Sequence, residues 1–222
     1  MKKLPVHIEI VSDVVCPWCV IGYYRLLQAL ERFEYSIEPT ISWLPFELNP
    51  QMPGEGQNLR EHLAEKYGTT PQESIEARQR LTDLGADVGF TFNYSDDMRM
   101  YNTFNAHQLL HWAAEQGKQN ELSIRLFEDF FGERRNVGDT EVLVQAAGEV
   151  GLDRDRARQV LEEQAYADQV RELEQLIAGQ GVQGVPLFVF NRQYAISGAQ
   201  EVATFEQQLQ QIIDESGESS TD

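Results

Sequence analysis

The chain contains two cysteines, Cys16 and Cys19, and two residues separate them. An apolar run with strand character precedes the pair, and a helical pattern begins directly after it. Cys16 would therefore stand at a helix N-terminus, where free N–H groups and the helix dipole stabilise a thiolate. Pro17 suits the first helical position, because its missing N–H would have no partner there. Cys19 lies on the same helix face and could attack a mixed disulfide on Cys16. The motif predicts a pair that cycles between dithiol and disulfide.

Two other uses of a cysteine pair are weaker. A zinc ion is bound by about four ligands. The sequence has no second cysteine pair, and no histidine stands close to Cys16 and Cys19. His107 and His111 are spaced as metal ligands on one helix face, but no acid completes a helical zinc signature. A structural disulfide over so short a loop would constrain the unfolded chain little. We therefore expect redox chemistry and no metal.

Composition excludes several classes of partner. Hydrophobic residues make up 41% of the 222 residues and aromatic residues 10%, which is typical of a globular protein. The net charge of −18 argues against nucleic acid or an anionic membrane as a partner. No run approaches the ~20 apolar residues of a membrane span, and the N-terminal lysines precede charged residues. We expect a cytoplasmic location, where a Cys-x-x-Cys pair is more often catalytic than structural.

The elements that must position the cysteines form an α/β pattern interrupted by helices. Strand-like periods cover residues 6–11, 36–48, 185–190 and 194–197. Between them the period stays helical for over a hundred residues, with Thr70, Asp139 and Asp153 as N-caps. This predicts a discontinuous α/β domain, residues 1–57 and 179–213, and an inserted helical subdomain, residues 58–178. We expect a disordered acidic tail over 214–222.

The insertion is predicted to pack across the Cys16 end of the α/β domain and so to form a substrate cleft. Residues 85–97 interrupt the helical period with glycines, aromatic residues and two aspartates. We expect this segment to be a mobile lip of the cleft.

Five stretches together carry a family resemblance. They are Ser12-Asp13 before Cys-Pro-Trp-Cys, the WLPFELNP of residues 43–50, the NTFNAH of residues 102–107, Gly184-Val185-Pro186, and the SGAQ of residues 197–200. In this order they resemble the DsbA-like thioredoxin superfamily, and more narrowly its FrnE-type oxidoreductases. The resemblance implies a thioredoxin fold with a large inserted α-helical subdomain, a redox site between the two parts, and thiol–disulfide oxidoreductase or isomerase activity.

The resemblance also implies roles for single residues. By position, Cys16 is the nucleophile, Cys19 the resolving cysteine, and Pro186 the cis-proline that stands beside the disulfide in this fold. A cis bond would present the backbone N–H and C=O of Val185 as a short strand edge for a bound peptide or thiol. Trp18, between the cysteines, is expected to stay near the surface and offer a contact to substrate.

Two further positions are candidates for the site. Glu9 is the favoured proton acceptor or donor for Cys19, because related folds bury an acid near this place and burial raises its pKa. Asp13 is the alternative. His107 and Asn102 belong to the NTFNAH stretch, and His107 either faces the cleft or packs its ring. With Trp18 and Val185 they complete the predicted substrate-binding set.

Thiol–disulfide exchange needs no metal and no bound organic cofactor. The expected partners are protein disulfides or small thiols, with glutathione or another thiol reductant as a candidate co-substrate. Monomer and homodimer both remain open. An alternative function is a glutathione-dependent isomerase or transferase, since the chain also resembles 2-hydroxychromene-2-carboxylate isomerases and kappa-class glutathione transferases. Those enzymes typically keep a serine in place of Cys16 and lack the second cysteine. A non-catalytic chaperone or interaction module would leave both cysteines without a role.

Overall fold

A four-stranded sheet forms the centre of the fold, with its strands in the order β2–β1–β5–β6. The computed structural model describes residues 3–218. Its sheet contains β1 (Leu4–Ser12), β2 (Ile37–Pro45), β5 (Leu187–Phe190) and β6 (Tyr194–Ser197). β1 pairs with β2 in parallel and with β5 antiparallel, so the two ends of the sequence share one sheet. β2 is an edge strand and ends at Pro45. This is the expected place for proline, because it has no N–H to donate to the hydrogen bonds between strands.

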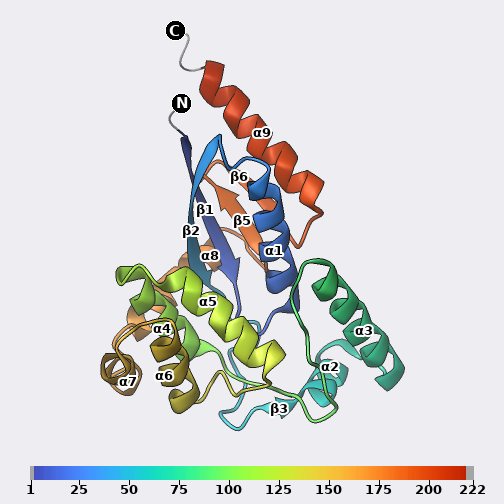
Figure 1. Cartoon of the computed structure of the whole chain (residues 1–222). Helices are drawn as coiled ribbons and strands as arrows, with labels where there is room; N and C mark the ends of the chain where they lie inside the picture. Colours follow the sequence, from blue (N-terminus) through green and yellow to red (C-terminus); the bar gives the residue numbers. More distant parts are fainter. Residues whose placement is uncertain (1–2, 219–222) are drawn as a thin grey trace.

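Two helices, α1 (Pro17–Glu31) and α9 (Val202–Glu218), cover one face of this sheet (Figure 1). β1 alternates buried and partly buried residues, so Ile8 and Ile10 enter the core together. The rings of Phe188 and Phe205 meet at 5.0 Å between β5 and α9. α1 approaches so closely that a Cβ on Gly22 would lie 2.9 Å from the Phe188 ring. The start of α1 is thereby fixed against the carboxyl end of β1.

The insertion consists of helices at the end of the sheet where β1 finishes and α1 begins (Figure 1). They are α2 (Leu59–Tyr67), α3 (Pro71–Asp87), α4 (Phe104–Glu115), α5 (Gln119–Phe127), α6 (Thr140–Glu149), α7 (Arg154–Glu162) and α8 (Ala167–Gly179). Thr70 forms the predicted capping box with Glu73, and the side chains of Asp139 and Asp153 cap α6 and α7. A π-helical turn, Glu128–Gly132, extends α5, and two short strands, β3 (Gln57–Asn58) and β4 (Arg99–Met100), pair beside α2. The thioredoxin fold with a helical insertion is confirmed.

Residues 85–97 are anchored by their aromatic side chains instead of forming an open lip. Phe90 and Phe92 are buried, and the Phe92 ring lies 4.9 Å from that of Phe131. Phe90 also meets Tyr24 of α1 at 5.7 Å, so this segment joins the insertion to the α/β domain. Such buried ring contacts oppose independent motion of the segment.

The prediction of a disordered tail is wrong for residues 214–218, because α9 continues to Glu218. Ile212 is buried and Ile213 packs against the core, which holds the last turns of the helix in place. Gln210 and Gln211 donate to the carboxylates of Asp214 and Glu215, pairs with helical i, i+4 spacing. Residues 219–222 lie outside the described part. No helix within residues 3–218 is long and apolar enough to cross a membrane.

Candidate active site

Cys16 is the N-cap residue of α1, with Pro17 at the first helical position. The Cys16 N–H donates to the Asp13 carbonyl at 3.0 Å, and the Cys16 carbonyl accepts from Cys19 N–H at 3.1 Å. The first turn of α1 contains no acidic side chain. No negative charge in this turn therefore opposes the effect of the free N–H groups and the helix dipole on Cys16. The thiol of Cys16 therefore stands at the positive end of the α1 dipole.

The chain before β5 forms the other wall of the site. The Cys16 thiol lies 3.8 Å from the Val185 carbonyl oxygen. The Val185–Pro186 peptide bond is cis, and the Pro186 carbonyl accepts from Gly198 N–H at 2.8 Å. Val11 pairs with Leu187 in the sheet, which brings the residues just before β5 beside the end of β1. A groove lined by residues 180–187 and by Ser197 and Gly198 opens next to this contact.

The two cysteines are free thiols and differ in their surroundings. Cys16 is 3% exposed and Cys19 is fully buried, while Trp18 between them remains 38% exposed. Burial, and then the neighbouring Cys16, raise the pKa of the Cys19 thiol well above its usual value. The Ser12 hydroxyl and the Asp13 N–H lie against this thiol and act in the opposite direction, but more weakly. Cys19 is thus held protonated behind Cys16.

Glu9 does not reach the cysteines. Its carboxylate accepts from Arg192 Nε at 3.2 Å and lies 3.6 Å from His7, on the sheet face opposite Ile8 and Ile10. Side chains alternate along a strand, so the residue between Ile8 and Ile10 faces away from the core that contains Cys16. The groups that act on the Cys19 thiol are Cys16, the Ser12 side chain and the Asp13 backbone N–H. The carboxylate of Asp13, the alternative to Glu9 in the sequence analysis, instead accepts from Leu48 N–H and lies beside His107.

Residues 7–210 match the family described as the DSBA-like thioredoxin domain. The chain belongs to this family. Its fold matches the crystal structure of a probable DsbA oxidoreductase from Streptomyces coelicolor with 36% identity and a TM-score of 0.85, over 93% of this chain and 89% of that one. The uncharacterized protein YwbO of Bacillus subtilis is 28% identical over 207 residues, which are 93% of this chain and 96% of that protein.

A more distant member of the fold is a cytosolic disulfide reductase, DsbM of Pseudomonas aeruginosa, solved with GSH. It shares 16% identity and a TM-score of 0.61, over 95% of this chain and 100% of that one. At this identity the likeness shows the DSBA-like fold alone.

Tyr94, in the segment before β4, is an ionisable residue that sequence reasoning missed. Burial, followed by the charge of Cys16, raises the pKa of the Tyr94 phenol. Its ring stacks on Phe92 at 5.6 Å and meets Phe131 at 6.2 Å. The alternating aromatic residues at 90, 92 and 94 were the available signal. The insertion thus contains a buried phenol whose pKa responds to the charge of Cys16.

His107 is buried and holds the loop before Cys16 without contacting the thiols. Its Nε2 lies 3.5 Å from Asp13 Oδ1 and 3.1 Å from the Phe46 carbonyl oxygen. Asp13 Oδ2 accepts from Leu48 N–H at 2.8 Å. Burial alone would lower the pKa of His107, but Asp13, with smaller contributions from Glu174 and Glu47, outweighs burial and raises that pKa. The pair therefore fixes the Ser12-Asp13 turn from the side of α4.

Asn102 lies farther from the cysteines, at the start of α4. Its Nδ2 is 3.4 Å from Glu47 Oε2 and 3.4 Å from the Pro50 carbonyl oxygen, and its Oδ1 accepts from Phe104 N–H. Glu47 in turn pairs with Arg171 of α8. The structure does not bring Asn102 to the thiol pair, and its contacts join α4 to the loop after β2.

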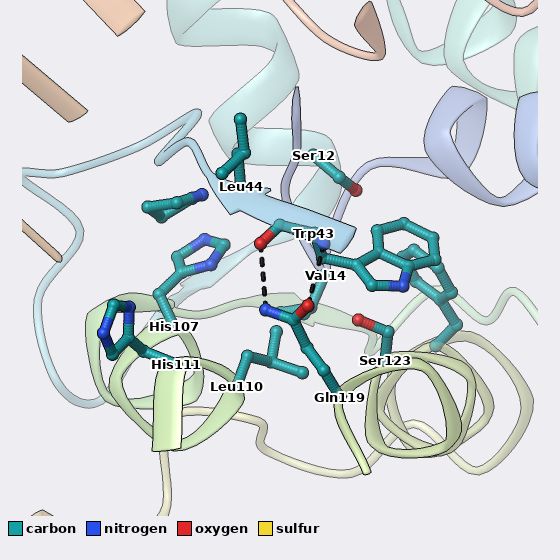
Figure 2. Close-up of a pocket in the computed structure, with 11 residues that line it drawn as sticks. Ser12, Val14, Trp43, Leu44, His107, Leu110, His111, Gln119 and Ser123 are labelled. Atoms are coloured by element: carbon teal, nitrogen blue, oxygen red, sulfur yellow. Dashed lines mark hydrogen bonds between the residues drawn. The ribbon is translucent and has the colours of Figure 1, made fainter. Parts of the chain in front are cut away.

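A small cavity lies behind the cysteine motif, between the ends of β1 and β2 and helices α4 and α5 (Figure 2). Its lining includes Ser12, His107, His111 and Ser123. Gln119 closes one side by donating to the Trp43 carbonyl and accepting from the Trp43 N–H, both at 2.9 Å. Gln119 of α5 thereby pairs the backbone N–H and C=O of Trp43 at the open edge of β2. Within residues 3–218, no three His, Cys, Asp or Glu side chains converge as a metal ion would require.

Proposed function

We propose that this protein is a thiol–disulfide oxidoreductase in which Cys16 attacks and Cys19 resolves. Cys16 Sγ attacks one sulfur of a substrate disulfide, a mixed disulfide forms, and the first substrate thiolate leaves. Cys19 Sγ then attacks Cys16 Sγ, the second substrate thiolate leaves, and a Cys16–Cys19 disulfide remains. Two electrons pass from the cysteine pair to the substrate. A thiol reductant, with glutathione as the candidate, returns the pair to its dithiol form.

The observation that carries the proposal is the asymmetry of the two thiols. Cys16 stands at the α1 N-terminus beside the Val185 carbonyl, whereas Cys19 is buried directly behind it with a raised pKa. A nucleophile needs a stabilised thiolate, and a resolving thiol must wait until the mixed disulfide forms. A cysteine pair that only forms a structural disulfide would not require two thiols in such different surroundings.

The surroundings support thiol or disulfide substrates. An extended peptide in the groove beside Val185 and Pro186 could pair with the backbone there and present its sulfur to Cys16. The exposed part of Trp18 adds apolar contact area at the rim. We propose the cytoplasm as the location, where a reducing thiol pool would keep the pair as dithiol and drive substrate reduction or isomerisation.

Reduction of insulin disulfides by glutathione tests this function. Wild-type protein should accelerate the reaction, Cys16→Ser should abolish the acceleration, and Cys19→Ser should leave at most a small part of it. Ser74→Ala, which alters a buried serine of α3 outside the thiol pair and the cavity behind it, is the matched control and should retain the activity. A Cys16→Ser protein that reduces insulin as fast as wild type would contradict the proposal and leave an isomerase or binding function to be sought.

A further inference from the structure

In the resolving step the fully buried Cys19 thiol must lose its proton. Ser12 is the residue whose side chain, besides that of Cys16, acts on this thiol. Ser12 is the last residue of β1 and is only 5% exposed. Its backbone is fixed, because its carbonyl accepts from Phe46 N–H at 3.1 Å. Its hydroxyl acts to lower the pKa of the Cys19 thiol, an effect that burial outweighs. Within residues 3–218, Ser12 Oγ has no partner with regular hydrogen-bond geometry. A buried hydroxyl without such a partner is costly unless it serves another purpose.

On its other side, Ser12 borders the cavity of Figure 2. The cavity measures about 20 Å³, and a water molecule needs roughly 10–15 Å³ and several polar partners. The side chains of Ser12, His107, His111 and Ser123 and the backbone of Trp43 provide polar groups around it. The space therefore suits about one water, and it links the hydroxyl beside Cys19 with the histidines of α4.

We propose that Ser12 transfers the proton of Cys19 to this cavity in the resolving step, an inference that rests on the proposed function. The Cys19 thiol gives its proton to Ser12 Oγ as the Ser12 hydroxyl proton passes to a cavity water. The Cys19 thiolate then attacks Cys16 Sγ, the Cys16–substrate S–S bond breaks, and the substrate sulfur leaves as a thiolate. The cysteine pair is oxidised and the substrate reduced, so electrons and protons balance.

The two cavity histidines have different parts. Burial lowers the pKa of His111, so near neutral pH its ring is unprotonated and can accept a proton. His111 is half-buried and faces Tyr166 at 5.2 Å, which places it between the cavity and solvent. His107 is engaged by Asp13, which raises its pKa against the effect of burial. His111 is therefore the outlet, while His107 holds the Ser12-Asp13 turn.

Few charged groups face Cys19, which makes the role of Ser12 measurable. Cys16 on α1 is the titratable neighbour, and Asp13 meets the thiol with its backbone N–H. From α4, His107 pairs with the Asp13 carboxylate, and in the segment before β4 the Tyr94 phenol interacts electrostatically with Cys16. None of these groups is removed by substitution of Ser12.

A single-turnover assay with the disulfide 5,5′-dithiobis(2-nitrobenzoate) isolates the step. Cys16 attacks this disulfide, so that one coloured 5-thio-2-nitrobenzoate leaves and the other stays bound to Cys16. Attack by Cys19 on Cys16 then releases the second coloured thiolate, whose appearance reports the resolving step. We expect Ser12→Ala to load normally but to resolve about 10- to 100-fold more slowly at neutral pH, the effect of losing a hydrogen bond to a charged group. Its rate should rejoin that of wild type at high pH, because hydroxide then removes the Cys19 proton directly.

Two further variants keep the test decisive. Ser12→Thr retains the hydroxyl and should resolve within about threefold of wild type. Ser74→Ala, which removes a buried serine hydroxyl of α3 that is unpaired among the described residues and does not line the cavity, should resolve normally. The inference is overturned if Ser12→Ala shows the wild-type pH profile, if it is slowed equally at all pH values, or if Ser12→Thr loses as much as Ser12→Ala. Failure of wild-type Cys16 to load at all would overturn the proposed function, and this inference with it.

Discussion

Cys16 Sγ lies 3.8 Å from the carbonyl oxygen of Val185, although 169 positions separate the two residues in the sequence. The contact joins the first strand-to-helix turn of the chain to the segment before the last hairpin, on opposite sides of the helical insertion. It depends on the antiparallel pairing of β1 with β5. Whatever keeps this sheet and its flanking helices in register also keeps the redox site assembled.

Arg25 should contribute measurably to that assembly. Its Nη1 donates to the Ala199 carbonyl at 2.8 Å, and the residue is only 8% exposed, so it ties α1 to the loop before α9. Arg25→Met should lower the free energy of unfolding by about 1.5–3 kcal/mol, because a buried carbonyl loses a charged donor. Denaturant unfolding measures this change. Arg32→Met, which removes an exposed ion pair with Glu206, should have little effect, and equal losses in the two variants would contradict the assignment.

Gly85 should tolerate no side chain. A Cβ at this position of α3 would lie 2.4 Å from the Phe92 ring and 2.8 Å from the Phe90 carbonyl oxygen. Gly85→Ala should therefore destabilise the protein by about 1–3 kcal/mol and displace the aromatic segment beside Cys16. Gly179→Ala, at the end of α8, meets nothing within 4 Å and should be neutral or slightly stabilising. Thermal unfolding of the two variants checks the contrast, and a stable Gly85→Ala protein would show that the segment is loosely packed.

The pKa of His107 predicts a specific pH dependence of stability. Its ring is favoured in the protonated form by Asp13 despite burial, so its pKa in the folded state exceeds the ordinary value of 6.5. The stability from this group is fully present below the unfolded pKa and is lost as pH rises through the raised folded pKa. The advantage of wild type over His107→Gln should therefore shrink as the pH is raised above about 6.5.

His111 provides the control, since burial lowers its pKa. The advantage of wild type over His111→Gln should grow as pH rises toward the unfolded pKa, which is the opposite slope. Urea unfolding of the three proteins at several pH values separates the two cases. Parallel slopes for both histidine variants would show that the Asp13–His107 pair does not favour the charged imidazole.

Local signals in the sequence were sufficient for much of the fold. The cysteine motif, the hairpin after Pro186 and the caps at Thr70, Asp139 and Asp153 each follow from neighbouring residues, and the structure contains all of them. Two-residue strands such as β3 and β4 are too short to show a period.

Long-range contacts explain the remaining differences. The two hydrogen bonds between Gln119 and the Trp43 backbone depend on how α5 packs, and the ring contact of Tyr94 with Phe131 depends on how the aromatic segment packs. No local sequence pattern indicates either contact. Glu9 is a different case. The strand alternation with Ile8 and Ile10 already pointed it away from the core, and the prediction followed the family resemblance instead.

The most direct test of the redox assignment is the intact mass of Cys19→Ser after incubation with oxidised glutathione, followed by peptide mapping. Without the resolving thiol, one glutathione should remain bound to Cys16, while wild type should pass through the same adduct to a Cys16–Cys19 disulfide. Dithiothreitol should remove the adduct and restore the free thiol. An unmodified Cys19→Ser protein, or a Cys16→Ser protein whose Cys19 takes up glutathione as fast as Cys16 does in Cys19→Ser, would contradict the assignment of Cys16 as the nucleophile.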